Sequence, residues 1–216
     1  MINKGQVISK IRTAFSDYQY PGDEYLLGSS EGSEPYDEIK SFIGQQDWTL
    51  LPSELLDAHS GSLNFFSEAG LRFFLPAYLI ADLNEQLQVA DPVFSLVHGF
   101  SNLSVEHQIG EQVFIRRTGR DAFINPKRYG ALTFHDYSRY RLSIFSREEA
   151  QAIVHFLEYK RGNDPHGINL DQIEAALTSF WYARAETAPT AETIAIHLLD
   201  EEKYLSALTS KIDDGS

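Results

Sequence analysis

The sequence lacks cysteine altogether. The chain can therefore form no disulfide bond, no thiolate zinc site and no iron–sulfur cluster, and it has no thiol nucleophile. Long apolar runs are also missing. The longest nearly uninterrupted one is Phe73 to Ala81, whereas a membrane-spanning helix needs roughly 20 residues. The first residues contain no apolar stretch of the kind found in secretory signals, so we expect a soluble, cytoplasmic protein that makes no contact with membranes.

Two recognised catalytic motifs are missing as well. The Gly/Ser/Glu stretch at 28–34 has neither the lysine of a P-loop nor a preceding strand. His155 and Glu158 are three residues apart, but a metalloprotease needs a second histidine four residues after the first. These absences weigh against an enzyme without deciding the question, and they favour a protein with no metal and no cofactor.

Charge is distributed unevenly along the chain. The whole sequence has 31 acidic and 18 basic residues, a net charge of −13. Residues 112–147 contain 8 of the basic residues and only two acids, Asp121 and Asp136, so this segment carries 8 − 2 = +6 and the remainder carries −13 − 6 = −19. A uniformly acidic protein would repel nucleic acid and anionic surfaces, but this one has a basic segment that could meet an acidic partner.

The basic segment supplies the first set of candidate functional residues. Aromatic side chains lie between the basic ones, as in surfaces that bind acidic proteins or, less favoured here, nucleic acids. The opposing interpretation is that the acidic remainder of the chain neutralises the segment internally. The partner-binding candidates are Arg116, Arg117, Arg120, Lys127, Arg128, Arg139 and Arg141, with Arg147 close behind.

Apolar spacing predicts a mainly α, single compact helical domain over residues 1–187, with a small β-hairpin element around 110–145. The stretches "QVFIRR", "ALTFHDY" and "YRLSIF" are the expected strands. Asn3 is the expected cap of the first helix, and Ser146 with Glu149 forms a capping-box pattern. Residues 188–216 are expected to form a C-terminal helix and a disordered tail. The helices are predicted at about 3–16, 36–43, 53–58, 92–98, 147–160, 170–185 and from 190.

The most apolar stretch is "FFSEAGLRFFLPAYLIADL", residues 65–83. Ser67 can cap a helix that begins with Glu68. Pro76 lacks an N–H group and clashes with the carbonyl four residues earlier, so the spacing predicts two helices, at 68–74 and 76–87, with the proline at the break.

Arg72 is the one basic residue in that stretch. Helical spacing places it opposite Leu71 and Phe74. It is either exposed, with its stem covering apolar surface, or buried and paired with a carboxylate such as Asp82 or Asp91.

The stretch "YPGDEY" offers an alternative site. Its two acids, Asp23 and Glu24, directly follow a Pro-Gly turn, and catalytic groups often lie on such loops. Tyr20 and Trp48 could wall a pocket there, with Arg72 nearby. The plainer interpretation is that the turn leaves both acids in solvent.

The chain resembles a family of bacterial domains of unknown function. The resemblance spans roughly residues 8–183 and follows the order "YPGD", W-x-x-L, "FFSEAGLRFFLPAYLIADL", "DPVFSL", "FSREEAQAIVHFLEYK" and "SFWYARA". Its most specific part is Leu71 to Leu79. The resemblance implies a mostly helical domain and no particular chemistry. Segment 104–140 is longer than the usual spacing, as an insertion would be, and the helix after Pro189 resembles an addition.

These observations lead to one functional hypothesis and one alternative. We expect a non-enzymatic cytoplasmic interaction protein, of an accessory or immunity type, that binds a protein partner or an acidic ligand. The alternative is a small-molecule enzyme or ligand-binding domain with a carboxylate pocket beside Pro21, Gly22 and Asp23. The sequence does not give the oligomeric state.

Overall fold

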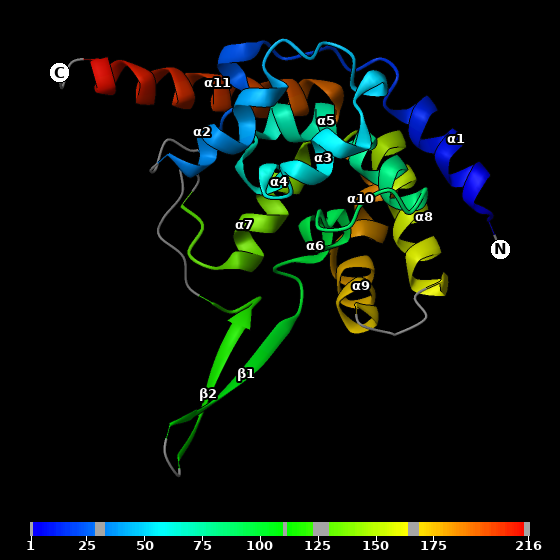
Figure 1. The fold of residues 1–216 in the computed structure, drawn as a ribbon, viewed down its shortest axis with the longest axis vertical. Coiled ribbons are helices and arrows are strands. Elements are labelled where there is room, and N and C mark those ends of the chain that lie inside the picture. Colours follow the sequence, from blue (N-terminus) through cyan, green and yellow to red (C-terminus); the bar gives the residue numbers. More distant parts are fainter. Residues whose placement is uncertain (1, 29–32, 110–111, 123–129, 164–168, 214–216) are drawn as a thin grey trace.

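Helices make up most of the molecule, and one β-hairpin stands apart from them (Figure 1). The computed structural model describes residues 2–28, 33–109, 112–122, 130–163 and 169–213. The helices gather around a central one, Glu68–Leu83, and the hairpin extends away from this helical body. The predicted mainly α fold with a small hairpin is confirmed, but the hairpin begins earlier in the chain than expected.

Turns of 3₁₀ or π geometry, labelled η, connect many of the helices. In chain order the elements are α1 (Lys4–Ala14), η1 (Asp23–Tyr25), α2 (Glu34–Ile39), η2 (Lys40–Phe42), η3 (Trp48–Leu50), α3 (Ser53–Ala58), α4 (Ser62–Phe65), α5 (Glu68–Leu83), α6 (Pro92–Val97), β1 (Asn102–Ile109), β2 (Gln112–Gly119), α7 (Phe134–Arg141), η4 (Leu142–Ile144), α8 (Arg147–Asn163), α9 (Leu170–Ala176), η5 (Leu177–Trp181), α10 (Tyr182–Glu186) and α11 (Ala191–Asp213).

Several helices begin where the sequence predicts. Asn3 caps α1, and its side-chain oxygen accepts a hydrogen bond from the Gln6 N–H at 3.0 Å. Ser146 and Glu149 form the predicted capping box at the start of α8: the Ser146 N–H donates to the Glu149 carboxylate at 2.6 Å, and the Glu149 N–H donates to the Ser146 hydroxyl at 3.2 Å. Such caps satisfy N–H groups that have no partner inside the helix, so they fix where each helix starts.

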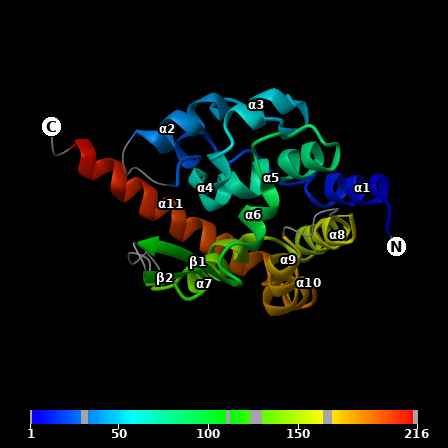
Figure 2. The ribbon, with the colours of Figure 1, turned by 60° about the horizontal axis from the view of Figure 1, so that its bottom comes forward.

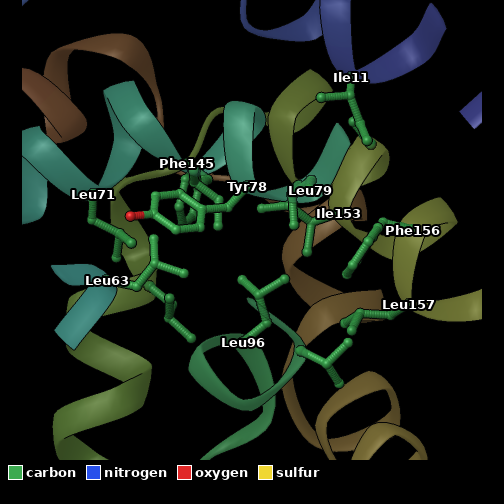
Figure 3. Close-up of a cluster of buried hydrophobic side chains, with 14 of the residues drawn as sticks. Ile11, Leu63, Leu71, Tyr78, Leu79, Leu96, Phe145, Ile153, Phe156 and Leu157 are labelled. Atoms are coloured by element: carbon green, nitrogen blue, oxygen red, sulfur yellow. The ribbon is translucent and has the colours of Figure 1, made fainter. Parts of the chain in front are cut away.

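The core is built around α5, of whose 16 residues all but two are buried. Figure 3 shows Tyr78 and Leu79 of this helix among Ile11 of α1, Leu96 of α6 and Ile153 of α8. All five side chains are fully buried. Burying a side chain of this size contributes roughly 1.5–3 kcal/mol, so the packing around α5 is the main source of stability.

Pro76 does not divide α5, and the predicted break there is wrong. The helix runs without interruption from Glu68 to Leu83 with the proline inside it. An interior proline costs about 3 kcal/mol. Fully buried side chains lie on both sides of it, among them Phe74, Leu75 and Leu79. Their burial offsets the cost, because a break would expose apolar surface in both halves.

Residues 134–144 are helical, so the strands predicted in "ALTFHDY" and "YRLSIF" are also wrong. They form α7 and η4. Thr133 starts α7: its hydroxyl accepts a hydrogen bond from the Asp136 N–H at 3.2 Å. Aromatic residues favour strands, but this local cap and the burial of Leu142 and Ile144 favour the helix.

The C-terminal helices complete the body. The helix predicted at 170–185 is present as α9, η5 and α10 in succession, with π geometry in the middle part. The helix predicted from residue 190 is α11, which crosses the body and contacts α5 and η4 (Figure 2). The tail after Asp213 lies outside the described residues. Within the described part of the chain, none of the helices has the length and apolar character needed to cross a membrane.

Candidate interaction surface

The hairpin formed by β1 and β2, called the arm below, extends away from the helical body (Figure 1). Its strands pair in antiparallel register from Asn102 opposite Gly119 to Ile109 opposite Gln112. They form a two-stranded sheet, so among the described residues each strand has one unpaired edge. Neither strand packs extensively against a described helix. A lone hairpin is marginally stable in water, and an unpaired edge is a template for another strand.

The base of the arm is held firmly to the helical body. The Asn102 side chain donates to the Asp121 carboxylate at 2.7 Å and accepts from the Asp121 N–H at 3.1 Å. The His135 N–H at the start of α7 donates to the Arg120 carbonyl at 3.1 Å. These bonds join both strands and α7, so the arm leaves the body in a defined direction.

The structure distributes the basic candidates rather than gathering them. Arg116 and Arg117 belong to β2, opposite Val105 and Ser104 in the register. Consecutive strand positions belong to opposite faces of a sheet, so positions 116 and 117 do not share one face. Their side chains, together with Lys127 and Arg128, lie outside the described part of the structure.

Three further basic candidates are exposed. Arg120 follows β2 and lies 3.9 Å from Asp121, Arg139 lies on α7, and Arg147 begins α8. They come from three separate elements, so the +6 charge of the segment is spread over the arm and the adjoining helices.

Arg141 is buried, so it is no surface contact for a protein partner. Its side chain is 7% exposed, and Nη2 donates to the carbonyl oxygens of Leu63 at 2.6 Å and Phe66 at 3.3 Å. In a strand, positions 139 and 141 would share one face. In the helix that forms instead, two residues are about 200° apart, which places Arg139 outside and Arg141 inside.

Of the residues predicted to form a pocket beside Asp23, the structure brings Tyr20 and Asp23 into contact. Asp23 is exposed, and its Oδ1 accepts hydrogen bonds from the Tyr20 hydroxyl at 2.5 Å and from the Gly44 N–H at 2.9 Å. These two bonds lower the pKa of Asp23. Burial and the bond to Asp23 raise the pKa of Tyr20. The carboxylate is thus engaged in fixing the loop against η2, and Glu24 beside it is exposed.

Trp48 and Arg72 lie elsewhere. Trp48 is buried beside a separate cavity of 170 Å³ that Arg12 and Ala81 also line. Arg72 forms a buried ion pair, as one of the two interpretations expected, but the predicted partners are wrong. Its Nε donates to both carboxylate oxygens of Glu149, at 3.0 and 2.9 Å, while Asp82 pairs with Lys160 at 2.9 Å and Asp91 caps α6.

The Arg72–Glu149 pair is the centre of a buried polar cluster. The Tyr18 ring lies 4.1 Å from the Arg72 guanidinium, and burial raises the pKa of Tyr18 to about 12. Burial also raises the pKa of Glu149, while Arg72 opposes the shift. Arg184 donates to the carbonyls of Ser143 and Phe145, and its burial lowers its pKa to about 10. The cluster joins the segment after α1 to α5, α8 and α10, so its role is to hold these parts of the chain in register.

Sequence reasoning missed the contact between α11 and α5. The carboxylate of Glu201 accepts hydrogen bonds from the N–H groups of Glu68, at 2.6 Å, and Ala69, at 3.0 Å. His197 lies 2.9 Å from the Glu68 carboxylate and stacks on Tyr140 at 4.3 Å. Glu68 and Glu201 are both buried. Glu201 lies in phase with the apolar residues Ile194, Leu198 and Leu205, and this was the available signal. The sequence does not show which helix start that acid meets.

The described residues form no group of histidine and acid side chains that could hold a metal ion. His155 Nδ1 lies 3.7 Å from the Glu158 carboxylate on a partly buried side of α8. The two carboxylates whose pKa burial raises, Glu149 and Asp82, are both engaged in ion pairs.

Comparisons with curated proteins and with solved structures each gave no match. A family model matches residues 3–185, which include the arm and the polar cluster up to α10 but not α11. The model describes a family of unknown function, DUF6714. Because the match covers most of the sequence, the chain belongs to this family.

Proposed function

We propose that the chain is a non-enzymatic interaction protein whose binding element is the arm, Asn102–Gly119. The observation that carries this proposal is the arm itself, a hairpin with unpaired outer edges that extends away from the helical body (Figure 1). A two-stranded sheet against which no described helix packs extensively is marginally stable. A partner strand added to one edge would complete the missing hydrogen bonds.

The partner that best fits is an extended, acidic protein segment that pairs with the free edge of β2. Residues 112–120, which include β2, contain Arg116, Arg117 and Arg120 and no acid, whereas β1 contains Glu106. The opposite charge of the partner would therefore favour the β2 edge over the β1 edge. Backbone hydrogen bonds would supply affinity, and the arginines would select the acidic sequence.

The test is a capture experiment with the full-length chain at low salt, followed by mass spectrometry and an absorbance ratio at 260 and 280 nm. We expect a stoichiometric protein that dissociates as salt rises, because screening weakens exposed charge pairs. The variant Arg116→Glu/Arg117→Glu/Arg120→Glu should lose it. Lys4→Glu/Lys10→Glu/Arg12→Glu makes the same change in charge on α1, away from the arm, and should retain it.

Each other outcome contradicts the proposal. Equal loss in both triple variants would mean that net charge, not the arm, controls binding. A partner retained by both would place the interface on another surface. Co-purified nucleic acid, or a chain that captures nothing, would exclude the acidic protein partner. Circular dichroism of both variants verifies that the helical body stays folded.

A further inference from the structure

A cavity of 220 Å³ lies between α6 and α7, at the foot of the arm. The chain leaves α6, forms the arm and returns into α7, so the two walls of the cavity flank the arm in sequence. The lining side chains that matter here are Phe94, His98, Phe134, Tyr137 and Arg141. Pockets for drug-sized ligands measure about 300–1,000 Å³, so this one suits a smaller molecule.

One wall of the cavity is aromatic. The His98 ring stacks on Phe94 with centroids 4.7 Å apart, and Phe134 meets His98 edge-on at 4.8 Å. Burial lowers the pKa of His98 below its usual 6.5, which favours the uncharged imidazole. The wall is therefore flat and uncharged, which favours a planar apolar body over a second charge.

The buried end of the cavity carries one positive charge, that of Arg141. Its guanidinium has five N–H donors, but only Nη2 makes hydrogen bonds with described residues, to the two carbonyl oxygens named above. None of the ion pairs among the described residues includes Arg141, whereas the buried Arg72 pairs with Glu149. A buried cation without an anion is costly, so the open donors of Arg141 mark a place for one.

The walls are held at a fixed separation. Gly99 follows His98 with φ +89°, and a Cβ at this position would lie 2.4 Å from the Ser138 hydroxyl and 2.7 Å from the Phe134 carbonyl oxygen. The Ser138 hydroxyl donates to the His98 carbonyl at 2.8 Å. This close approach of the segment after α6 to α7 means that the cavity is formed before any ligand enters, which lowers the entropic cost of binding.

We propose that this cavity binds a small organic monocarboxylate with a planar, apolar body. The carboxylate would accept hydrogen bonds from the free side of the Arg141 guanidinium, whose planar fork matches two carboxylate oxygens. The flat body would lie against the rings of Phe94, His98 and Phe134. Arg141 supplies one positive charge and the uncharged imidazole supplies none. The cavity therefore compensates one negative charge, and a dianionic phosphate fits less well. This site is separate from the edge of the arm, and either proposal can fail alone.

The test is isothermal titration calorimetry of the full-length chain with benzoate and phenylacetate, using benzamide and inorganic phosphate as controls. We expect the two carboxylates to bind with millimolar affinity or better, about −4 kcal/mol. We expect benzamide and phosphate to bind at least about tenfold more weakly, because each lacks either the charge or the apolar fit. No heat from either carboxylate at about 10 mM would overturn the proposal, as would benzamide equal to benzoate.

Two variants locate the binding. Arg141→Lys keeps the charge but not the fork, and it should weaken benzoate binding at least about tenfold. Arg139→Lys, two residues earlier on the exposed side of α7, should leave it unchanged. Arg141 also donates hydrogen bonds to two carbonyl oxygens, so circular dichroism is needed to show that the variant still folds. A second variant, Ser95→Phe, fills the cavity and leaves Arg141 in place. Benzoate binding that survives Ser95→Phe would place the ligand elsewhere and refute the site.

Discussion

Two arginines with little exposed surface, Arg72 and Arg141, occupy contrasting environments in this fold. The Arg72 side chain is 13% exposed and its Nε contacts both oxygens of Glu149. Arg141 is more deeply buried, at 7% exposure as a whole residue, yet its described hydrogen bonds go only to backbone carbonyls. The first lies in a cluster between packed helices, and the second faces a cavity at the foot of the arm.

The difference teaches that burial alone does not give the role of a charged side chain. Removing one partner of a buried ion pair leaves an uncompensated charge. The contribution of the Arg72 cluster to folding stability therefore requires both Arg72 and Glu149. Arg141 has no acid among its described contacts, so its charge is available to an anion from outside. The two regions can be tested against each other with matched substitutions.

The largest effect is expected from Arg72→Met. It leaves the Glu149 carboxylate buried without its cation, and we expect the free energy of unfolding to fall by about 3–5 kcal/mol. Arg141→Met leaves only two carbonyl oxygens without their hydrogen-bond donor. It should lower the free energy of unfolding by less, about 1–3 kcal/mol. Urea denaturation measures both, with the exposed Arg147→Met as the matched control near zero. Equal losses at Arg72 and Arg141 would remove the contrast between them.

A smaller loss of folding stability is expected from Glu201→Ala, which tests whether Glu201 of α11 caps the N-terminus of α5. The N–H groups of Glu68 and Ala69 would lose their acceptor. Loss of a helix cap costs about 0.5–2 kcal/mol, and release of α11 should make residues 191–213 more sensitive to limited proteolysis. The neighbouring Glu202→Ala serves as control. Identical cleavage of the two variants would show that Glu201 does not hold α11 in place.

The smallest effect concerns the pH dependence of stability near the cavity. Burial lowers the pKa of His98 below its usual 6.5, so the unfolded chain binds a proton more readily than the folded one. The stability that His98 contributes is therefore fully present above about pH 6.5 and is lost as the pH falls toward the lowered pKa. Thermal melts between about pH 7 and 5 should drop more steeply for the wild-type chain than for His98→Gln. Parallel curves would mean that His98 does not titrate differently on folding.

Much of the fold could be predicted because local signals agree with it. Asn3 and the Ser146–Glu149 pair cap helix N-termini through short-range hydrogen bonds, and a local sequence pattern predicts such caps. Pro76 was misleading because the rule about proline is local, whereas the packing that keeps α5 continuous comes from helices distant in sequence. The segment 134–144 was misleading because its aromatic residues favour strands and its cap, Thr133, was overlooked.

The candidate sites were less predictable than the fold. Arg72 was expected to be exposed or paired, but its partner lies 77 residues away, and spacing cannot identify such a contact. The expected strands, "ALTFHDY" and "YRLSIF", give no reason to separate Arg139 from Arg141, whereas the helical period of α7 places one outside and the other inside. The link from Glu201 to the start of α5 spans 133 residues and joins two elements whose order in sequence says nothing about their contact.

The register of the arm has a consequence for how its length can change in related chains. Asn102 and Gly119 are paired directly, so the two ends of the arm lie side by side and the body does not depend on the number of residues between them. Adding one residue to each strand keeps every existing pair, whereas adding one residue to a single strand would reverse the faces of all positions beyond it. Insertions and deletions in this arm should therefore come in even numbers, a periodicity that sequences alone can reveal.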